Sequence, residues 1–247
     1  MSVRICLVIG LSEELDEVEQ EVAEVIKAAE DCGLFDKVYK INARSTTVQQ
    51  FQELLLQATK DLADNSKLLV FYSGHGCCAA HAPSLTWIKL QDDQTSKRVA
   101  LEAEILNYIA KAAKGRNMPL PRFLDIALVF SSCREALNGE VPNLPPEVQV
   151  DDSWELTKMY ACQPGSRVDD CVSVLLGLSF AYYLPKRPGT LPTLLECVQH
   201  DVQHLSLNQI KPEIVRDSNA RLALLHSDRT ADGIEEIMGA TQLADLS

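Results

Sequence analysis

The sequence predicts an α/β fold: a three-layer α/β/α sandwich with a mainly parallel six-stranded sheet. Apolar runs of strand length alternate along the chain with longer segments whose apolar residues recur at helical spacing. The run at 68–72 shows no polar alternation, which indicates a strand that is covered on both faces. With 247 residues, 46% of them hydrophobic, the chain can bury the core of one large domain that spans 1–247.

The composition of the chain argues against several classes of function. The net charge of −12 argues against nucleic acid or an anionic membrane as the main partner, because both need clustered Lys and Arg. The apolar run of the first ten residues is too short for a signal peptide, and no stretch approaches the length of a membrane span. Eight cysteines form no C-x-x-C pair, so we expect reduced thiols in a cytoplasmic protein.

The first half of the chain predicts strands and helices in alternation. We expect strands at 3–9, 38–41 and 68–72. A helix follows the first strand, with Ser12 as its cap and Gly33 at its end. A second helix begins at Thr46 or Thr47 and precedes the third strand.

The second half continues the alternation less regularly. A loop is expected at 77–84, and an intersubunit-type linker loop rich in Pro, Asn and Gly at 137–157. The expected strands are 85–90, 123–130 and 158–162, with 221–225 as a candidate for the last, and the expected helices are 102–113, 172–184 and 191–205. The core is predicted to cover about 3–212, followed by a tail that is hard to interpret.

Two buried strands each end in a reactive side chain, His75 and Cys133. The two residues are 58 positions apart with a helix between them, as a right-handed crossover between neighbouring parallel strands needs. Ligands of open α/β sheets bind at this carboxyl edge. An imidazole there can take the proton of a thiol and return it to a leaving amine. The amides of Gly76 and Cys133 are the expected donors to a developing oxyanion.

At these residues the chain resembles the caspase-like cysteine peptidases: caspases, metacaspases and paracaspases. Tyr72-Ser73-Gly74-His75-Gly76 is similar to the family's histidine motif in its metacaspase form, and Ser131-Ser132-Cys133-Arg134 to its cysteine motif. Tyr160-Ala161-Cys162-Gln163-Pro164-Gly165 resembles the strand and turn that line the substrate cleft. The resemblance covers most of the chain. It implies a fold of caspase-haemoglobinase type, with His75 as acid/base and Cys133 as nucleophile.

The resemblance also locates the pocket for P1, the residue before the scissile bond. Caspases bind aspartate there with arginines, but the segment 11–26 contains no Lys or Arg. Acidic side chains in that region favour a basic P1 residue, Arg or Lys. The predicted substrate-binding residues are Glu21, Ser73, Ser131, Ala161, Asp169 and Asp170.

The alternatives to this pocket come from departures from the family pattern. Ser131 stands where metacaspases have Asp and caspases have Gln, and Glu135 replaces a Gly. Arg167 lies close enough to the predicted pocket to compensate its charge. One alternative is therefore a peptidase that cuts after Asp, and the other a catalytically inactive caspase-like module that binds signalling partners.

The linker also bears on whether the enzyme cuts after basic residues or after Asp. Residues 137–157 contain no Lys or Arg but do contain Asp151-Asp152. An enzyme that cuts after basic residues cannot process itself there, so we predict a single-chain enzyme. Its expected partners are protein or peptide substrates.

No cofactor is required by the predicted chemistry. Glu196, His200 and His204 have the helical spacing of metal ligands, but they lie opposite the apolar face, which favours a solvated surface. Asp92-Asp93 suit calcium, and calcium activation is the less favoured alternative to an ordinary loop. Cys77-Cys78 are expected to be partly buried, inert thiols rather than a redox switch.

Overall fold

A six-stranded sheet forms the middle layer, in the order β10-β9-β7-β3-β1-β2. The computed structural model describes residues 2–13, 15–79, 82–92, 95–136, 150–164, 174–186, 191–206 and 211–217. Neighbouring strands are parallel except that β10 runs antiparallel to β9. The strands are β1 (Arg4–Leu11), β2 (Lys37–Ala43), β3 (Lys67–Gly74), β7 (Asp125–Ser131), β9 (Glu155–Tyr160) and β10 (Glu213–Asp217).

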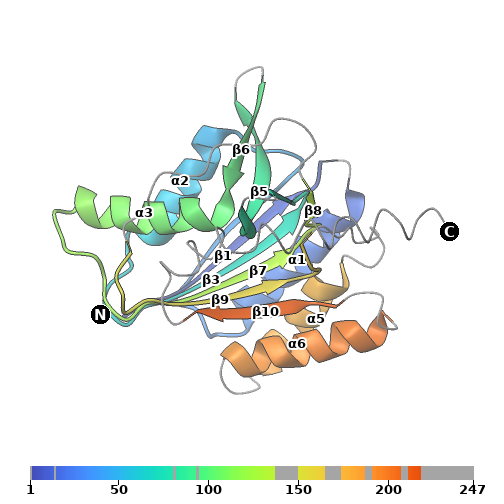
Figure 1. Cartoon of the computed structure of the whole chain (residues 1–247). Helices are drawn as coiled ribbons and strands as arrows, with labels where there is room; N and C mark the ends of the chain where they lie inside the picture. The colour runs from blue at the N-terminus through green and yellow to red at the C-terminus, as the bar shows by residue number, and fades with distance from the viewer. Residues whose placement is uncertain are drawn as a thin grey trace.

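Helices cover both faces of this sheet (Figure 1). One face packs against α2 (Val48–Thr59) and α3 (Leu101–Gly115). The other packs against α1 (Asp16–Asp31), α5 (Leu175–Tyr183) and α6 (Leu191–Leu205). The central strands are buried from both sides because their side chains alternate between these two apolar clusters. The predicted three-layer sandwich with a mainly parallel six-stranded sheet is confirmed.

A local sequence signal explains where α2 begins, but not where α1 begins. The hydroxyl of Thr47 accepts a hydrogen bond from the amide of Gln50, whose side chain accepts from the Thr47 amide, and this capping box starts α2. The predicted cap at Ser12 is wrong. The Ser12 amide donates to the carbonyl of Ala43 at 3.0 Å, so this residue extends the sheet, and α1 begins only at Asp16.

A second, four-stranded sheet stands at the carboxyl end of the first, in the order β6-β5-β4-β8. Its strands are β4 (Cys77–Ala79), β5 (Ala82–Asp92), β6 (Thr95–Ala100) and β8 (Glu135–Ala136). The predicted loop at 77–84 is therefore wrong. The strand β4 is held by pairing with β8, far away in the sequence, which local patterns do not show.

Two predicted boundaries also need correction. The linker was expected to reach residue 157, but Trp154 is buried, with its indole N–H donating to the carbonyl of Pro121 at 2.6 Å, and β9 begins at the next residue. The core was expected to end near 212, but β10 adds the sixth strand at 213–217. The candidate strand 221–225 and residues 137–149 of the linker lie outside the described residues.

Among the helices that the structure describes, none is long and apolar enough to cross a membrane. No disulfide joins the seven cysteines in the described part of the chain.

Candidate active site

His75 and Cys133 follow neighbouring parallel strands at the same edge of the sheet. Strand pairing fixes their relative position from both sides. Before the pair, Ser73 of β3 is in register with Ser131 of β7. After it, Cys77 of β4 is in register with Glu135 of β8. Both registered pairs keep the sequence offset that separates His75 from Cys133, so the two residues lie on neighbouring chain segments between the two ladders.

Gly76 brings the two backbones into contact beside this pair. A Cβ atom placed on Gly76 would lie 2.6 Å from the Ser132 hydroxyl and 2.7 Å from the carbonyl oxygen of Cys133. No side chain fits in that space, so only glycine permits this approach. The backbones of Gly76 and Cys133, predicted to form the oxyanion hole, are therefore neighbours.

The orientation of His75 is fixed by main-chain contacts. Its ring is exposed, and Nε2 lies 2.9 Å from the carbonyl oxygen of Glu13, just beyond β1. A carbonyl oxygen can only accept, so Nε2 carries the proton in this contact and Nδ1 is left as the basic nitrogen. The hydroxyl of Tyr72 donates to the carbonyl of His75 at 2.7 Å, which holds the backbone of the turn.

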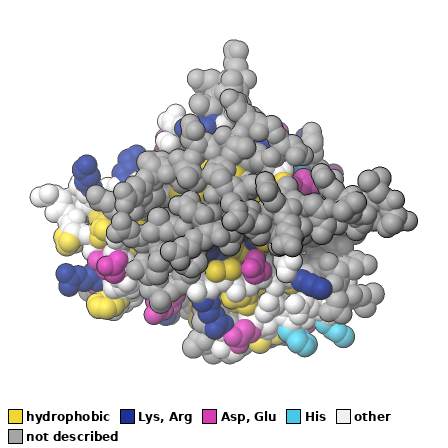
Figure 2. Space-filling model, viewed as in Figure 1, with side chains coloured by type: hydrophobic (Ala, Val, Ile, Leu, Met, Phe, Trp, Pro, Cys, Tyr) yellow, Lys and Arg dark blue, Asp and Glu magenta, His cyan; other side chains and the backbone are white. Residues whose placement is uncertain are grey.

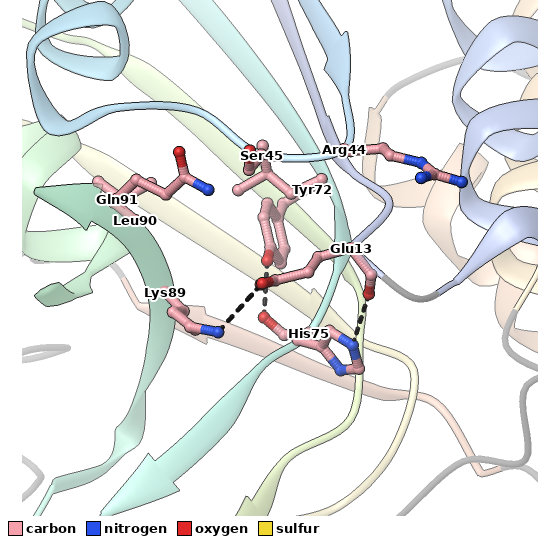
Figure 3. Close-up of a pocket in the computed structure, with 9 residues that line it drawn as sticks. Glu13, Arg44, Ser45, Tyr72, His75, Lys89, Leu90 and Gln91 are labelled. Carbon is pink, nitrogen blue, oxygen red and sulfur yellow. Dashed lines mark hydrogen bonds and ion pairs between the residues drawn. The ribbon is translucent and has the colours of Figure 1, made fainter. Parts of the chain in front are cut away.

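The side chain of Glu13 is held in turn by the second sheet. Lys89 of β5 lies 3.2 Å from each carboxylate oxygen of Glu13. Figure 3 shows both contacts beside His75, with the ring and the carbonyl of Glu13 facing each other. The sequence could not reveal this arrangement, because the group that meets His75 is a backbone carbonyl.

Glu21, Ser73 and Ser131, three of the predicted substrate-binding residues, lie together and buried near the carboxyl edge of the sheet. The carboxylate of Glu21 accepts hydrogen bonds from both serine hydroxyls, at 2.7 Å from Ser131, and from the amide of Gly177 on α5 at 2.8 Å. Only 1% of Glu21 is exposed. Burial raises the pKa of this carboxyl to about 7, although the three hydrogen bonds act in the opposite direction.

Replacing Glu21 with Gln is expected to remove a pH-dependent loss of stability. The pKa is about 4.5 in the unfolded chain and about 7 in the folded one, so the folded form binds the proton more tightly. The stability that Glu21 contributes is therefore fully present below pH 4.5 and is lost as the pH rises towards 7. Gln can accept from Gly177 and Ser131 and donate to Ser73. Between pH 5 and pH 8 the variant should gain about 2–3 kcal/mol relative to wild type in urea unfolding. Parallel pH profiles for the two proteins would contradict the assignment.

Of the remaining predicted substrate-binding residues, the structure describes only Ala161. Ala161 is buried directly after β9, and its amide donates to the carbonyl of Phe130 at 2.9 Å, so this amide already belongs to the sheet. Asp169 and Asp170 lie outside the described residues.

Two other thiols flank the chain around Cys133. Cys78 donates to the carbonyl of Arg134 at 3.1 Å, and Cys162 lies 3.8 Å from the carbonyl of Ser132. Burial raises the pKa of Cys162 to about 12, and burial also raises the pKa of Cys77. Cys133 is half-buried and so more accessible than Cys78 or Cys162. Cys77 is partly buried as expected, whereas Cys78 is fully buried; the inertness of both thiols stays a prediction.

Arg134, directly after the proposed nucleophile, is a site feature that the sequence argument missed. It is 2% exposed, and its guanidinium carbon lies 3.7 Å from the ring centre of Tyr160. One of its nitrogens pairs with Glu213 of β10 at 3.2 Å. These contacts attach the segment that carries Cys133 to both β9 and β10.

The alternative metal sites receive no support from geometry. Among the described residues, no group of three or more metal-ligating side chains lies close together. Glu196 of α6 pairs with Arg216 at 2.6 Å, while histidine side chains lie at the surface over this helix (Figure 2). Asp93, one of the two candidate calcium ligands, lies outside the described residues.

Comparison with known proteins bears on the fold. No model of a protein family matches the chain, and a search of curated proteins gives no match. Among solved structures, the chain is similar to the crystal structure of protein GSU0716 from Geobacter sulfurreducens, with a TM-score of 0.52 and 12% sequence identity. The match covers 87% of this chain and 93% of that one. At this identity the likeness concerns the fold alone.

Proposed function

We propose that this chain is a cysteine endopeptidase of the caspase-like type, with Cys133 as nucleophile and His75 as acid/base. The observation that supports the proposal is the common register on both sides of the pair: the segments that carry His75 and Cys133 are neighbours at the carboxyl edge of the sheet, where α/β folds commonly bind ligands. Its substrates are peptides or proteins. A reducing compartment such as the cytoplasm suits a thiol nucleophile.

The reaction follows from the roles of the groups. Nδ1 of His75 takes the proton of the Cys133 thiol, and the thiolate attacks the scissile carbonyl carbon. The amides of Gly76 and Cys133 stabilise the oxyanion that forms. When the carbon–nitrogen bond breaks, the imidazolium gives its proton to the leaving amine. Water, activated by the same imidazole, then hydrolyses the thioester and restores the thiol.

The hydrogen bonds of Glu21 support a basic P1 preference. Ser73 and Ser131 each donate their only hydroxyl proton to its carboxylate. Both serine oxygens can therefore act only as acceptors towards any other group. Ser73 and Ser131 are 1% and 2% exposed, so like Glu21 they are buried. The cluster therefore acts on P1 through the negative charge that Glu21 carries when its carboxyl is ionised, which favours Lys or Arg and repels a carboxylate.

A library of fluorogenic peptides that differ only at P1 tests this proposal. We expect cleavage after Arg and Lys with kcat/KM at least about tenfold above cleavage after Asp, since like-charge juxtaposition in a pocket costs more than 1 kcal/mol. Preferred cleavage after Asp would contradict the proposed P1 pocket but would agree with the proposed dyad of His75 and Cys133. No cleavage of any peptide, with protein that is folded by circular dichroism, would favour the non-catalytic interaction module.

A further inference from the structure

A small pocket lies next to His75, on the side away from Cys133. Its cavity holds about 20 Å³, and the rim opens to solvent. The ends of three parallel strands and the hairpin strand β5 form its walls. The lining residues are Leu11, Glu13, Arg44, Ser45, Tyr72, His75, Lys89, Leu90 and Gln91, most of which are labelled in Figure 3.

Most of the side chains that line this pocket are polar, and their net charge is positive. Lys89 is 47% exposed and points towards Glu13 (Figure 3), so its ammonium is accessible to a ligand that enters. Arg44 adds a second cation at the rim, with its guanidinium turned outward. Glu13 is the one carboxylate in the lining, so the charge sums to one positive unit. Gln91 and Ser45 supply neutral hydrogen-bonding groups.

The sheet order determines which part of a substrate reaches this pocket. Cys133 extends β7, and His75 extends β3 on one side of it, while β9 lies on the other side. The acid/base protonates the leaving amine, so the segment after the scissile bond must lie on the β3 side. Continuing in that direction leads over the ends of β1 and β2, from which Glu13 and Arg44 follow. The segment before the bond lies over β9.

We infer that this pocket is a primed-side subsite, which binds the first residues after the scissile bond and favours an acidic side chain there. The inference rests on the proposed peptidase function, because the direction of the substrate follows from the roles of His75 and Cys133. An incoming carboxylate pairs with the ammonium of Lys89 in competition with Glu13. The subsite therefore selects by charge on the leaving segment, separately from the P1 selection beside Glu21.

The test uses internally quenched peptides that share one sequence up to the scissile bond and carry either Glu or Lys at the two positions after it. For the wild-type protein we expect kcat/KM to be about fivefold higher with Glu, the effect of a partly exposed ion pair. Lys89→Met should reduce this ratio to near one. Glu13→Gln should increase it, because the competitor for Lys89 is removed while the carbonyl that holds His75 stays.

Lys97→Met is the matched control. Lys97 is exposed on β6, the neighbouring strand of the hairpin, and does not belong to the pocket lining. The control should keep the wild-type ratio. Cleavage without a preference for Glu, or a preference that Lys89→Met leaves unchanged, would overturn the subsite alone. Failure to cleave either peptide would instead overturn the proposed function.

Discussion

Alanine at Cys133 is expected to abolish peptide hydrolysis, and alanine at His75 to lower kcat by a factor of at least about 10³. Without the thiol no acyl-enzyme forms, and without the imidazole the thiol stays mostly protonated at neutral pH. The two losses should not multiply in the double variant, because the groups act as a unit. Steady-state hydrolysis of a peptide substrate, with each protein checked for folding, measures these effects.

Covalent labelling gives an independent measurement of the same pair. A peptidyl electrophile that reacts with active-site thiols should label wild type at Cys133 and label the His75→Ala variant far more slowly. Cys197→Ala is the control, because this thiol is half-buried like Cys133 but lies on α6. Labelling that is independent of His75 would remove the imidazole from the mechanism. It would favour the reading of the chain as a binding module.

Gly76→Ala is expected to lower kcat/KM by at least about a hundredfold while the protein still folds. The new methyl group would meet the carbonyl oxygen of Cys133 and the Ser132 side chain at distances that real Cβ atoms do not tolerate. One of the two backbones must move, and the amides proposed for the oxyanion hole move with it. Loss of one such donor costs about 10²- to 10³-fold in kcat.

Gly115→Ala separates this effect from a general effect of alanine. A Cβ on Gly115, the last residue of α3, meets no atom within 4 Å. The control should keep wild-type activity. Thermal unfolding of both variants shows whether Gly76→Ala loses activity through a local change at the site or through a loss of overall stability. Full activity in Gly76→Ala would mean that the oxyanion donors lie elsewhere.

The parts of the fold that sequence predicted well depend on local patterns. Apolar runs located β1, β3 and β7, and the expectation of a helix start at Thr46 or Thr47 agrees with the start of α2, which Thr47 caps. In the small sheet, the expected strand 85–90 falls within β5, but β4 and β8 were missed because they are short and pair across 58 positions. Their stability comes from the partner strand, which no window of sequence contains.

In the candidate site, too, the features with a local sequence pattern could be predicted and those that depend on distant partners could not. His75 and Cys133 follow apolar strands, so the sequence placed them at one edge. The burial of Glu21 had a signal that the sequence argument left aside: position 21 falls on the stripe formed by Val18, Val22 and Val25. No sequence signal could indicate the contact between His75 and the Glu13 carbonyl, because backbone groups are the same in every residue.

Strand pairing on both sides of the dyad has a consequence for evolution. The spacing of His75 and Cys133 is set by main-chain ladders, which any sequence of suitable propensity can form. The side chains of the two proposed subsites come from different segments: α1 on one side, and β5 with the ends of β1 and β2 on the other. In the proposed peptidase, substitutions in those segments would change the substrate preference in small steps while His75 and Cys133 stay the same.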